Sequence, residues 1–300
     1  MRVVIDRYVP YLQGVLEPFC SVDYLSPEAI TADAVRDADA LIIRTRTKAN
    51  KALLEHSSVR FIATATIGFD HLDESYLREH GITYGSCPGC NAQAVCDYVE
   101  EALPPDARSI GIVGVGHVGS LVKQMAERKG LQVLVSDPPK GFHDDVTEAD
   151  VITFHTPLTK EGLYPTYHLC DAAFLSRCKL SALIINAARG GVVDEQALLG
   201  SGRPFVLDCW EGEPDINNAV LAQARMASYH IAGYSVQGKR NASQTCLDAL
   251  TRYFGLPQLT IMSDDGIRGD SAPGWLKRIT TELKAHPEDF ERLRKNYKLR

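Results

Sequence analysis

Short apolar runs alternate with longer polar or amphipathic stretches along most of this chain. In the first hundred residues the apolar runs are 2–6, 40–44, 61–64 and 82–85, and stretches such as 27–37 and 50–56 between them have helical character. Runs of this length separated by helices are typical of a mainly parallel sheet that is covered on both faces. The first part of the chain is therefore predicted to be an α/β domain.

A second series of the same kind follows the proline pair in Leu103-Pro-Pro-Asp106. Because proline cannot continue a helix, this pair predicts a helix end and a linker. The apolar runs after it are 109–113, 132–136, 151–155, 182–186, 205–208 and 226–229. This spacing predicts a second doubly wound parallel-sheet domain over residues 106–228.

The last part of the chain has a different pattern. Residues 237–254 predict one helix, 256–272 are rich in Asp, Gly and Pro, and 274–300 predict charged amphipathic helices. Phe290 and Leu293, with charged residues between them, fit a helix that docks one apolar face. Its basic end is interpreted as a solvated surface, with a dimer interface or an anion site as alternatives.

Composition and charge exclude several classes of protein. The chain has 300 residues, with 32 Lys and Arg against 38 Asp and Glu, a net charge of −6. It therefore lacks the overall basic field that nucleic acid or an anionic membrane would require. No run approaches the roughly 18 apolar residues of a membrane helix, and the first residues do not resemble a signal peptide.

Eight cysteines are scattered along the chain, which is typical of reduced thiols in the cytoplasm. The closest pair is Cys87-Pro-Gly-Cys90. No second pair follows at a spacing suited to zinc, so no metal site is expected. The pair is interpreted as small residues at a turn, with a redox pair as the alternative.

A glycine-rich loop lies between an apolar strand and a helical pattern, in the segment 111–119. Gly114 allows a tight turn, Gly116 lets the backbone approach a pyrophosphate, and Gly119 permits close packing of helix on sheet. The amides of His117 and Val118 begin the helix, where its dipole favours negative charge. The loop predicts a dinucleotide site.

Asp137 ends the next predicted strand, 18 residues after Gly119. A carboxylate at this position can accept hydrogen bonds from both ribose hydroxyls and would repel a 2′-phosphate. The sequence therefore favours NAD over NADP, and the nearby Lys140 weakens that preference slightly.

Further polar residues follow the other strands of the second series. They are His155-Thr-Pro157, the segment 186–191, Asp208 with Glu213, and His230. Ligands in such sheets bind outside the carboxyl ends of the strands, so these residues are expected to converge on one edge.

The segments 114–119 with Asp137, 186–190, 208–214 and 228–234 together resemble the D-2-hydroxyacid dehydrogenase family. The family carries a catalytic Arg, Glu and His in this order, and Arg189, Glu213 and His230 occupy the matching positions. The chemistry agrees, because histidine titrates near neutrality and can act as a general base. A hydrogen-bonded glutamate would raise the pKa of that histidine, and a guanidinium offers a planar fork for a carboxylate.

The stretches 44–48, 64–71, 88–92, 210–214 and 293–297 further resemble a branch of the family that oxidises a phosphorylated hydroxy acid. The resemblance implies contacts with NAD from Thr156, Ala187, Ala188, Asp208 and Gly233, and contacts with substrate from Thr45, Thr66 and Tyr234. Arg44, Arg46 and Lys48 form a basic cluster, and at least one of them is expected to face the substrate phosphate. If this segment is extended, all three point the same way.

The resemblance also implies the domain organisation. Residues 1–98 and 229–255 would form a flavodoxin-like substrate domain, and 99–228 an inserted Rossmann domain that binds NAD. Residues 256–300 would form a short α-rich C-terminal segment for dimerisation in a cytoplasmic homodimer, and a cleft between the domains would close over both ligands.

Two alternatives remain at this point. One is another D-2-hydroxyacid dehydrogenase, of the phosphoglycerate or the glyoxylate and hydroxypyruvate type. The other is a non-catalytic NAD-sensing module on the same scaffold, since fold alone does not determine function. The trio Arg189, Glu213 and His230 favours an enzyme, because a binding module needs no base.

Overall fold

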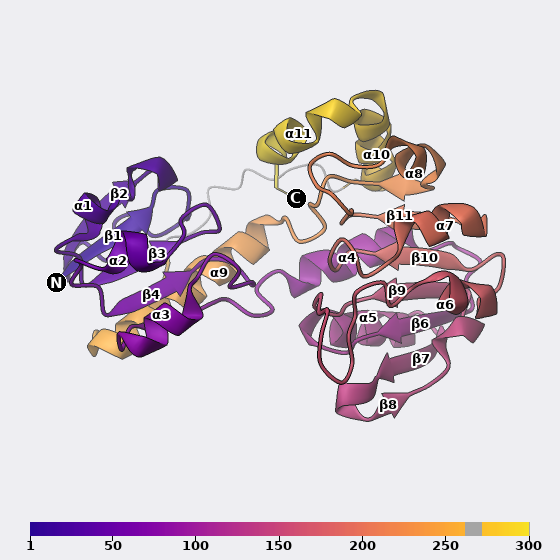
Figure 1. Ribbon diagram of the computed structural model, residues 1–300, viewed down its shortest axis with the longest axis horizontal. Coiled ribbons are helices and arrows are strands. Elements are labelled where there is room, and N and C mark those ends of the chain that lie inside the picture. The colour runs from indigo at the N-terminus through magenta and orange to yellow at the C-terminus, as the bar shows by residue number, and fades with distance from the viewer. Residues whose placement is uncertain (262–271, 300) are drawn as a thin grey trace. The chain divides into compact units, whose positions relative to one another are not determined.

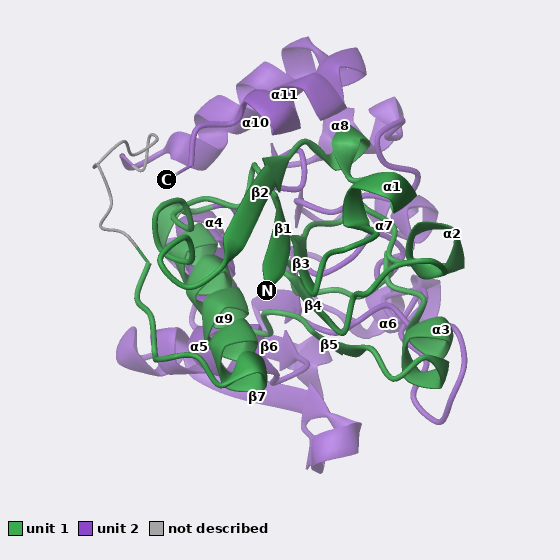
Figure 2. Cartoon of the chain, turned by 90° about the vertical axis from the view of Figure 1, so that its left-hand side faces the viewer, with its two compact units in different colours: residues 1–91, 235–268 green, residues 92–234, 269–300 purple. Residues whose placement is uncertain are grey.

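The computed structural model describes residues 1–261 and 272–299, which divide into two compact units (Figure 2). Unit 1 comprises Met1–Asn91 and the described residues from Ser235 onward to 261. Unit 2 comprises Ala92–Tyr234 and the described residues 272–299. The chain thus leaves unit 1 after Asn91 and returns to it at Ser235.

Unit 1 contains a five-stranded parallel sheet in the order β2-β1-β3-β4-β5. Its strands are β1 (Arg2–Asp6), β2 (Ser21–Leu25), β3 (Ala40–Ile43), β4 (Phe61–Thr64) and β5 (Thr83–Gly85). This is the strand order of flavodoxin-like folds. The short helices of the unit are η1 (Pro27–Ala29), α1 (Ala32–Val35), α2 (Lys51–Leu54) and α3 (Glu74–Glu79).

The three central strands of unit 1, β1, β3 and β4, bury both of their faces. Val3 and Ile5 of β1 pack in one core with residues of the long helix α9 (Val236–Phe254), whereas Val4 packs in a second core with residues of α2 and α3. Because successive side chains of a strand point to opposite faces, the central strands read as continuous apolar runs.

Unit 2 contains a seven-stranded sheet in the order β12-β11-β10-β9-β6-β7-β8 (Figure 1). Its strands are β6 (Ser109–Val113), β7 (Gln132–Asp137), β8 (Phe142–His143), β9 (Val151–Phe154), β10 (Leu183–Asn186), β11 (Phe205–Leu207) and β12 (Met226–Ala227). All pairs are parallel except β7 with β8. The strand order reverses at β6, which has β7 on one side and β9 on the other. Ligands bind at such a switch point in open α/β sheets.

The helices of unit 2 pack around this sheet. They are α4 (Ala92–Ala102), α5 (His117–Arg128), η2 (Pro138–Lys140), η3 (Val146–Glu148), α6 (Ala172–Arg177), α7 (Glu195–Ser201), α8 (Asn218–Gln223), α10 (Trp275–Ala285), η4 (Pro287–Asp289) and α11 (Phe290–Asn296). Helix α4 contacts α5 and α10, while α6 contacts α7 and α7 contacts α8. Phe290 and Leu293 of α11 are buried in the same core, as their spacing predicts.

The expected fold class is confirmed: two parallel-sheet α/β units with a helical C-terminal extension. The helix predicted over 237–254 is α9, and helices α10 and α11 lie within 274–300, whereas most of the segment 256–272 lies outside the described residues. A helix ends just before the proline pair at 104–105, as predicted.

Two predicted helical stretches are shorter than expected, and two strands were not predicted. The segment 27–37 forms a 3₁₀ turn and a four-residue helix rather than one helix, and 50–56 contains only the four-residue helix α2. The sequence pattern missed β2 and β8, which lie at sheet edges and are not fully buried. Edge strands carry mixed polar and apolar residues, which a search for apolar runs passes over.

The compact units divide at Asn91 and Tyr234 rather than at the expected positions 98 and 229. The position of α4 explains the first of these differences. Val95, Tyr98 and Val99 of α4 are buried in the same core as β6 and α5, so this helix packs as part of unit 2. In the part of the chain that the structure describes, no helix is both long and apolar enough to cross a membrane.

Candidate active site

The glycine loop between β6 and α5 has the geometry that its sequence predicts. Gly114 has a φ of +89°, in the left-handed region that favours glycine. A Cβ on Gly119 would collide with the carbonyl oxygen of Gly114, so α5 can begin this close to the loop only without a side chain there. No atom lies within 4 Å of the position of a Cβ on Gly116, which leaves its backbone open to a ligand.

Asp137 lies at the end of β7, beside this loop. Its Oδ2 accepts a hydrogen bond of 2.8 Å from the amide of Val115. The Nζ of Lys140 lies 3.8 Å from the same oxygen and donates to the carbonyl of Val115 at 2.7 Å. The carboxylate is therefore fixed against the loop, where a ribose would approach it.

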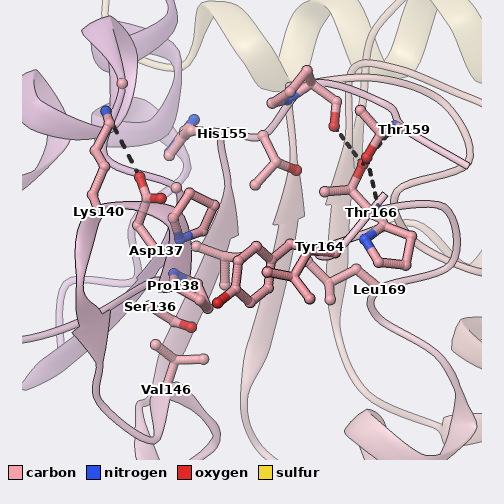
Figure 3. A pocket seen from close by; sticks show the side chains of 18 of the residues that line it. Ser136, Asp137, Pro138, Lys140, Val146, His155, Thr159, Tyr164, Thr166 and Leu169 are labelled. Carbon is pink, nitrogen blue, oxygen red and sulfur yellow. Dashed lines mark hydrogen bonds and ion pairs between the residues drawn. The ribbon is translucent and has the colours of Figure 1, made fainter. Parts of the chain in front are cut away.

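A cavity of about 690 Å³ opens over the glycine loop, entirely within unit 2. Figure 3 shows Asp137 with Lys140 on one side of it, Thr159 with Thr166 on the other, and Tyr164 between them. The Oγ1 of Thr156, which lines the cavity, is buried and has no hydrogen-bond partner. An unsatisfied buried hydroxyl and an open glycine backbone fit a dinucleotide, which brings both donors and acceptors.

Arg189 follows β10 in a loop that the side chain of Asn186 holds in place. Asn186 donates to the carbonyl of Arg189 at 2.9 Å and accepts from the amide of Ala188 at 3.1 Å. A Cβ on Gly190 would collide with the carbonyl oxygen of Trp210, so only glycine lets this loop pack on the segment that precedes Glu213. The Arg189 side chain is exposed, with Nη1 donating to the Ala188 carbonyl at 2.8 Å.

The structure brings Glu213 and His230 together. The Nδ1 of His230 lies 2.8 Å from Oε2 of Glu213, and the amide of Trp210 donates to the other oxygen at 2.9 Å. His230 has a φ of +59°, an uncommon conformation for a residue that is not glycine, and such strain concentrates at functional sites.

Asp208 holds the backbone that follows His230. Its Oδ1 accepts from the amide of Ile231 at 2.7 Å and from the hydroxyl of Ser228 at 2.7 Å, and its Oδ2 accepts from the amide of Ala232 at 2.9 Å. The carboxylate is buried. These contacts give Asp208 a structural role in addition to the NAD contact that the resemblance implies. Gly233, which the resemblance also assigns to NAD, follows Ala232 in the same loop.

The surroundings of His230 change its acid strength. Its pKa is raised well above the ordinary value by the adjacent Cys209 side chain and by the hydrogen bond with Glu213, while burial acts in the opposite direction. Glu213 keeps a proton on Nδ1, so Nε2 is the nitrogen that can accept one from a substrate. Burial raises the pKa of the Cys209 thiol.

Tyr234 lies at the end of the same segment, under helix α11. The guanidinium of Arg294 lies over its ring, with Cζ 5.9 Å from the ring centroid, and the rings of Tyr234 and Tyr297 are 6.4 Å apart. The C-terminal helix therefore supports this predicted substrate residue.

The basic cluster of unit 1 differs from the expectation. The segment 44–48 is a turn, closed by a hydrogen bond of 3.0 Å from the amide of Thr47 to the carbonyl of Arg44, so the idea of an extended segment with three cations on one face was wrong. Arg44 pairs with the buried Asp6 through two hydrogen bonds, of 2.9 and 3.3 Å, whereas Lys48 is exposed.

The two threonines expected to bind substrate also lie in unit 1. Thr45 is exposed in the same turn as Arg44. The hydroxyl of Thr66 lies 2.7 Å from that of Thr64 and donates to the carbonyl of Gly68 at 3.1 Å, so it is held in place by its own loop.

Sequence reasoning missed two acidic contacts around the site. Glu195 begins α7 and is buried, and it accepts a hydrogen bond of 2.6 Å from the amide of Glu211. The Nε2 of His168 lies 2.8 Å from Oε1 of Glu211. Both contacts hold the segment that carries Glu213, and burial raises the pKa of Glu195 to about 7. No short motif shows them, because they join residues 16 and 43 positions apart.

Cys87 and Cys90 are both free thiols. The Sγ of Cys87 is buried 3.6 Å from that of Cys246, and the carbonyl oxygens of Thr64 and Ala242, at 3.3 and 3.2 Å, are the two acceptors within reach of its single S–H. The structure thus places Cys87 in packing contacts of unit 1.

Comparison with known proteins identifies a sequence family that matches most of the chain. The sequence family described as "D-isomer specific 2-hydroxyacid dehydrogenase, catalytic domain" matches residues 3–259. The chain is 40% identical over 336 residues to erythronate-4-phosphate dehydrogenase of Bacteroides fragilis, an alignment that covers 100% of this chain and 97% of that one. It is 42% identical over 281 residues to the Porphyromonas gingivalis protein of the same name, covering 85% of this chain and 76% of that one.

A solved structure has the same fold. NAD⁺-bound 3-phosphoglycerate dehydrogenase of Entamoeba histolytica superposes with a TM-score of 0.71 over 88% of this chain and 99% of that one, at 21% identity.

Proposed function

Because this chain belongs to the D-isomer specific 2-hydroxyacid dehydrogenase family, we propose that it oxidises 4-phospho-D-erythronate to 2-oxo-3-hydroxy-4-phosphobutanoate with NAD as cofactor. It is an NAD-dependent dehydrogenase, and its relatives at about 40% identity along the whole chain are named for this reaction. The observation that carries the proposal is the contact of 2.8 Å between His230 and Glu213 in the unit that also holds the dinucleotide cavity.

The residues of unit 2 supply the acid–base chemistry of this reaction. Bound NAD would supply the acceptor for the hydride of the hydroxyl-bearing carbon of the substrate. His230 takes the hydroxyl proton at Nε2, because Nδ1 is engaged with Glu213. The Glu213 carboxylate stabilises the resulting imidazolium, and the Arg189 guanidinium holds the substrate carboxylate. In the reverse direction, the raised pKa of His230 makes it a ready proton donor.

NAD is held in unit 2 by the residues around the cavity. The amides of His117 and Val118, at the N-terminus of α5, would hold the pyrophosphate, with Gly114, Gly116 and Gly119 shaping the loop. Asp137 accepts from the ribose hydroxyls and disfavours NADP by charge repulsion. Thr156, Ala187, Ala188, Asp208 and Gly233 complete the proposed contacts.

Substrate contacts are proposed for Thr45, Thr66 and Tyr234. Arg44 and Lys48 are the candidates for the phosphate. The ion pair of Arg44 with Asp6 occupies much of its guanidinium, so Lys48 is the stronger candidate.

The reaction is a step toward pyridoxal 5′-phosphate. We place the protein in the cytoplasm as a homodimer, as its eight free thiols and the family resemblance suggest. We retain 1–98 with 229–255, 99–228 and 256–300 as the proposed functional domains.

The test is an assay of NADH formation with 4-phospho-D-erythronate, 3-phosphoglycerate and glycerate. We expect turnover with 4-phospho-D-erythronate at the highest kcat/KM, and a kcat lower by about 10²–10⁴ in His230→Ala, the usual contribution of a general base. NAD binding should survive that substitution, which separates loss of the base from loss of the fold.

Other outcomes would point to the alternatives. Preferred turnover of 3-phosphoglycerate or glycerate would assign the chain to another enzyme of the family. Binding of NAD without turnover of any hydroxy acid would favour an NAD-sensing module.

A further inference from the structure

Cys209 lies beside the candidate acid–base pair, although the proposed reaction makes no use of it. It follows β11 and Asp208, and its thiol is buried. Its Sγ, a carboxylate oxygen of Glu213 and a ring nitrogen of His230 all lie within 4.8 Å of one another. Three different donor types therefore converge at one point, from two loops that meet only in the folded chain.

These donors are the ones that zinc prefers. Thiolate, imidazole and carboxylate bind Zn²⁺ at about 2.0–2.3 Å, so donor atoms in a zinc tetrahedron are about 3.3–3.8 Å apart. All three ligand atoms lie within 4.8 Å of one another, so side-chain movements of about 1 Å would bring them into that arrangement. Binding would form bonds from the cation to sulfur, oxygen and nitrogen, and would release to water the thiol proton and the proton of the His230 nitrogen that binds the cation. A water molecule can complete the fourth position.

The charge around the three donors favours a cation. Asp208 Oδ2 lies 3.9 Å from the Cys209 sulfur. The segment between Cys209 and Glu213 also contains Glu211, whose amide is bound by the Glu195 carboxylate. These carboxylates attract a divalent cation, against the opposing charge of Arg294, which interacts with Glu213 from α11.

The site is both accessible and held in place. The His230 and Glu213 side chains are 29% and 19% exposed, so an ion can reach them from solvent. The Trp210 amide fixes one oxygen of Glu213, and Asp208 fixes the backbone after His230. Donors that are already positioned lose little freedom when they bind an ion.

We propose that Cys209, Glu213 and His230 form a binding site for a thiophilic divalent cation such as Zn²⁺, and that the bound cation blocks proton transfer by His230. The blocking effect rests on the proposed function, whereas cation binding does not. Hard cations such as Mg²⁺ prefer oxygen ligands and are not expected to bind here.

Cadmium tests the binding without any need for enzymatic activity. Titration of the full chain with Cd²⁺, in the absence of NAD and substrate, should produce the ultraviolet charge-transfer absorption of a cadmium–thiolate bond. Cys209→Ala should lose this absorption at low cation concentration, with an apparent affinity weaker by at least about tenfold. His286, Glu288 and Asp289 form a second group of side chains that could hold a cation. This group contains no thiol, so it cannot contribute to the cadmium–thiolate absorption.

Cys246→Ala is the matched control, because it removes a buried thiol that lies 3.6 Å from Cys87 in unit 1. The absorption should persist in this variant. If it is lost in Cys246→Ala and kept in Cys209→Ala, the cation binds the other thiols and the proposal is overturned. Cys209→Val, which fills the space of the side chain, gives the same comparison if the alanine variant does not fold.

A second measurement tests the effect on proton transfer. Zn²⁺ should inhibit NADH formation, with each rate taken relative to the same variant without cation. Cys209→Ala should need at least about tenfold more Zn²⁺ for half inhibition, while Mg²⁺ should inhibit neither protein. Equal sensitivity of both proteins would contradict the blocking role. A chain without dehydrogenase activity that still shows the cadmium absorption would refute the proposed function alone.

Discussion

At the scale of single residues, the site depends on contacts that change the chemistry of ordinary side chains. The hydrogen bond with Glu213 orients the His230 ring. The hydrogen bond from the Ile231 amide to Asp208 holds the backbone beside His230, which has a positive φ. The identity of both residues could be read from the sequence, since a resemblance placed them in order. The neighbouring Cys209 could not, because nothing in its surrounding motif shows that its sulfur faces the imidazole.

Glu195 gives a prediction about pH. Its pKa is raised to about 7, chiefly by burial, with the charges of Glu211, Glu213 and Asp194 acting in the same direction. The folded chain therefore holds this proton to a higher pH than the unfolded chain does. The free energy of unfolding should fall as pH rises from about 4.5 through 7, because the proton is then lost from a buried carboxyl.

Glu195→Gln removes the titration and keeps an oxygen that can accept from the Glu211 amide. Between pH 5 and pH 8, urea unfolding should show that the wild type loses about 1–3 kcal/mol more stability than this variant. Glu148→Gln, at an exposed position, is the control and should follow the wild type. An identical pH dependence in the wild type and Glu195→Gln would show that Glu195 does not retain its proton.

At the scale of secondary structure, the sequence located most strands because buried parallel strands are continuous apolar runs. The glycine loop was also predicted from the sequence, since Gly114 and Gly119 occupy positions where a side chain would not fit. The helices α1 and α2 of unit 1 were predicted as longer helical stretches, because a four-residue helix has too few turns for a period to show where it begins and ends.

Helix α11 gives a prediction at this scale. Arg294 faces the Tyr234 ring, whereas Arg292 of the same helix is exposed and pairs with Asp289. Arg294→Gln should loosen Tyr234 and raise the KM for the hydroxy acid by about 3–10-fold, with a smaller change in kcat, as loss of a cation–π contact would cause.

Arg292→Gln is the matched control and should leave both constants unchanged. Equal effects of the two substitutions would mean that α11 acts only through stability. No change in Arg294→Gln would remove its contact with Tyr234 from substrate binding.

At the scale of the whole chain, the two units have separate tasks in the proposal. The cavity, the glycine loop and the candidate acid–base pair belong to unit 2, which continues from Ala92 to Tyr234 without interruption and also contains α10 and α11. The candidate catalytic and cofactor residues of unit 2 therefore share one seven-stranded sheet as their support.

This division predicts how the chain responds to NAD alone. In hydrogen–deuterium exchange, NAD should slow exchange most in the segments 114–119, 137–140 and 155–157, because the cavity lies in unit 2. Peptides from β1 and β3 at the centre of the unit 1 sheet are the internal reference and should change least. Protection of those peptides in preference to the glycine loop would place the cofactor elsewhere.

The sequence by itself determined the fold class and the glycine loop, and its family resemblance put forward the candidate acid–base residues. These properties depend on local rules: strand periodicity, the conformational freedom of glycine, and the chemistry of each side chain. Only the tertiary structure decided that Arg44 pairs with Asp6, that Glu195 supports the segment before Glu213, and that Cys209 lies against His230. Such contacts join residues distant in the chain, and their pKa values depend on burial, which exists only once the chain has folded.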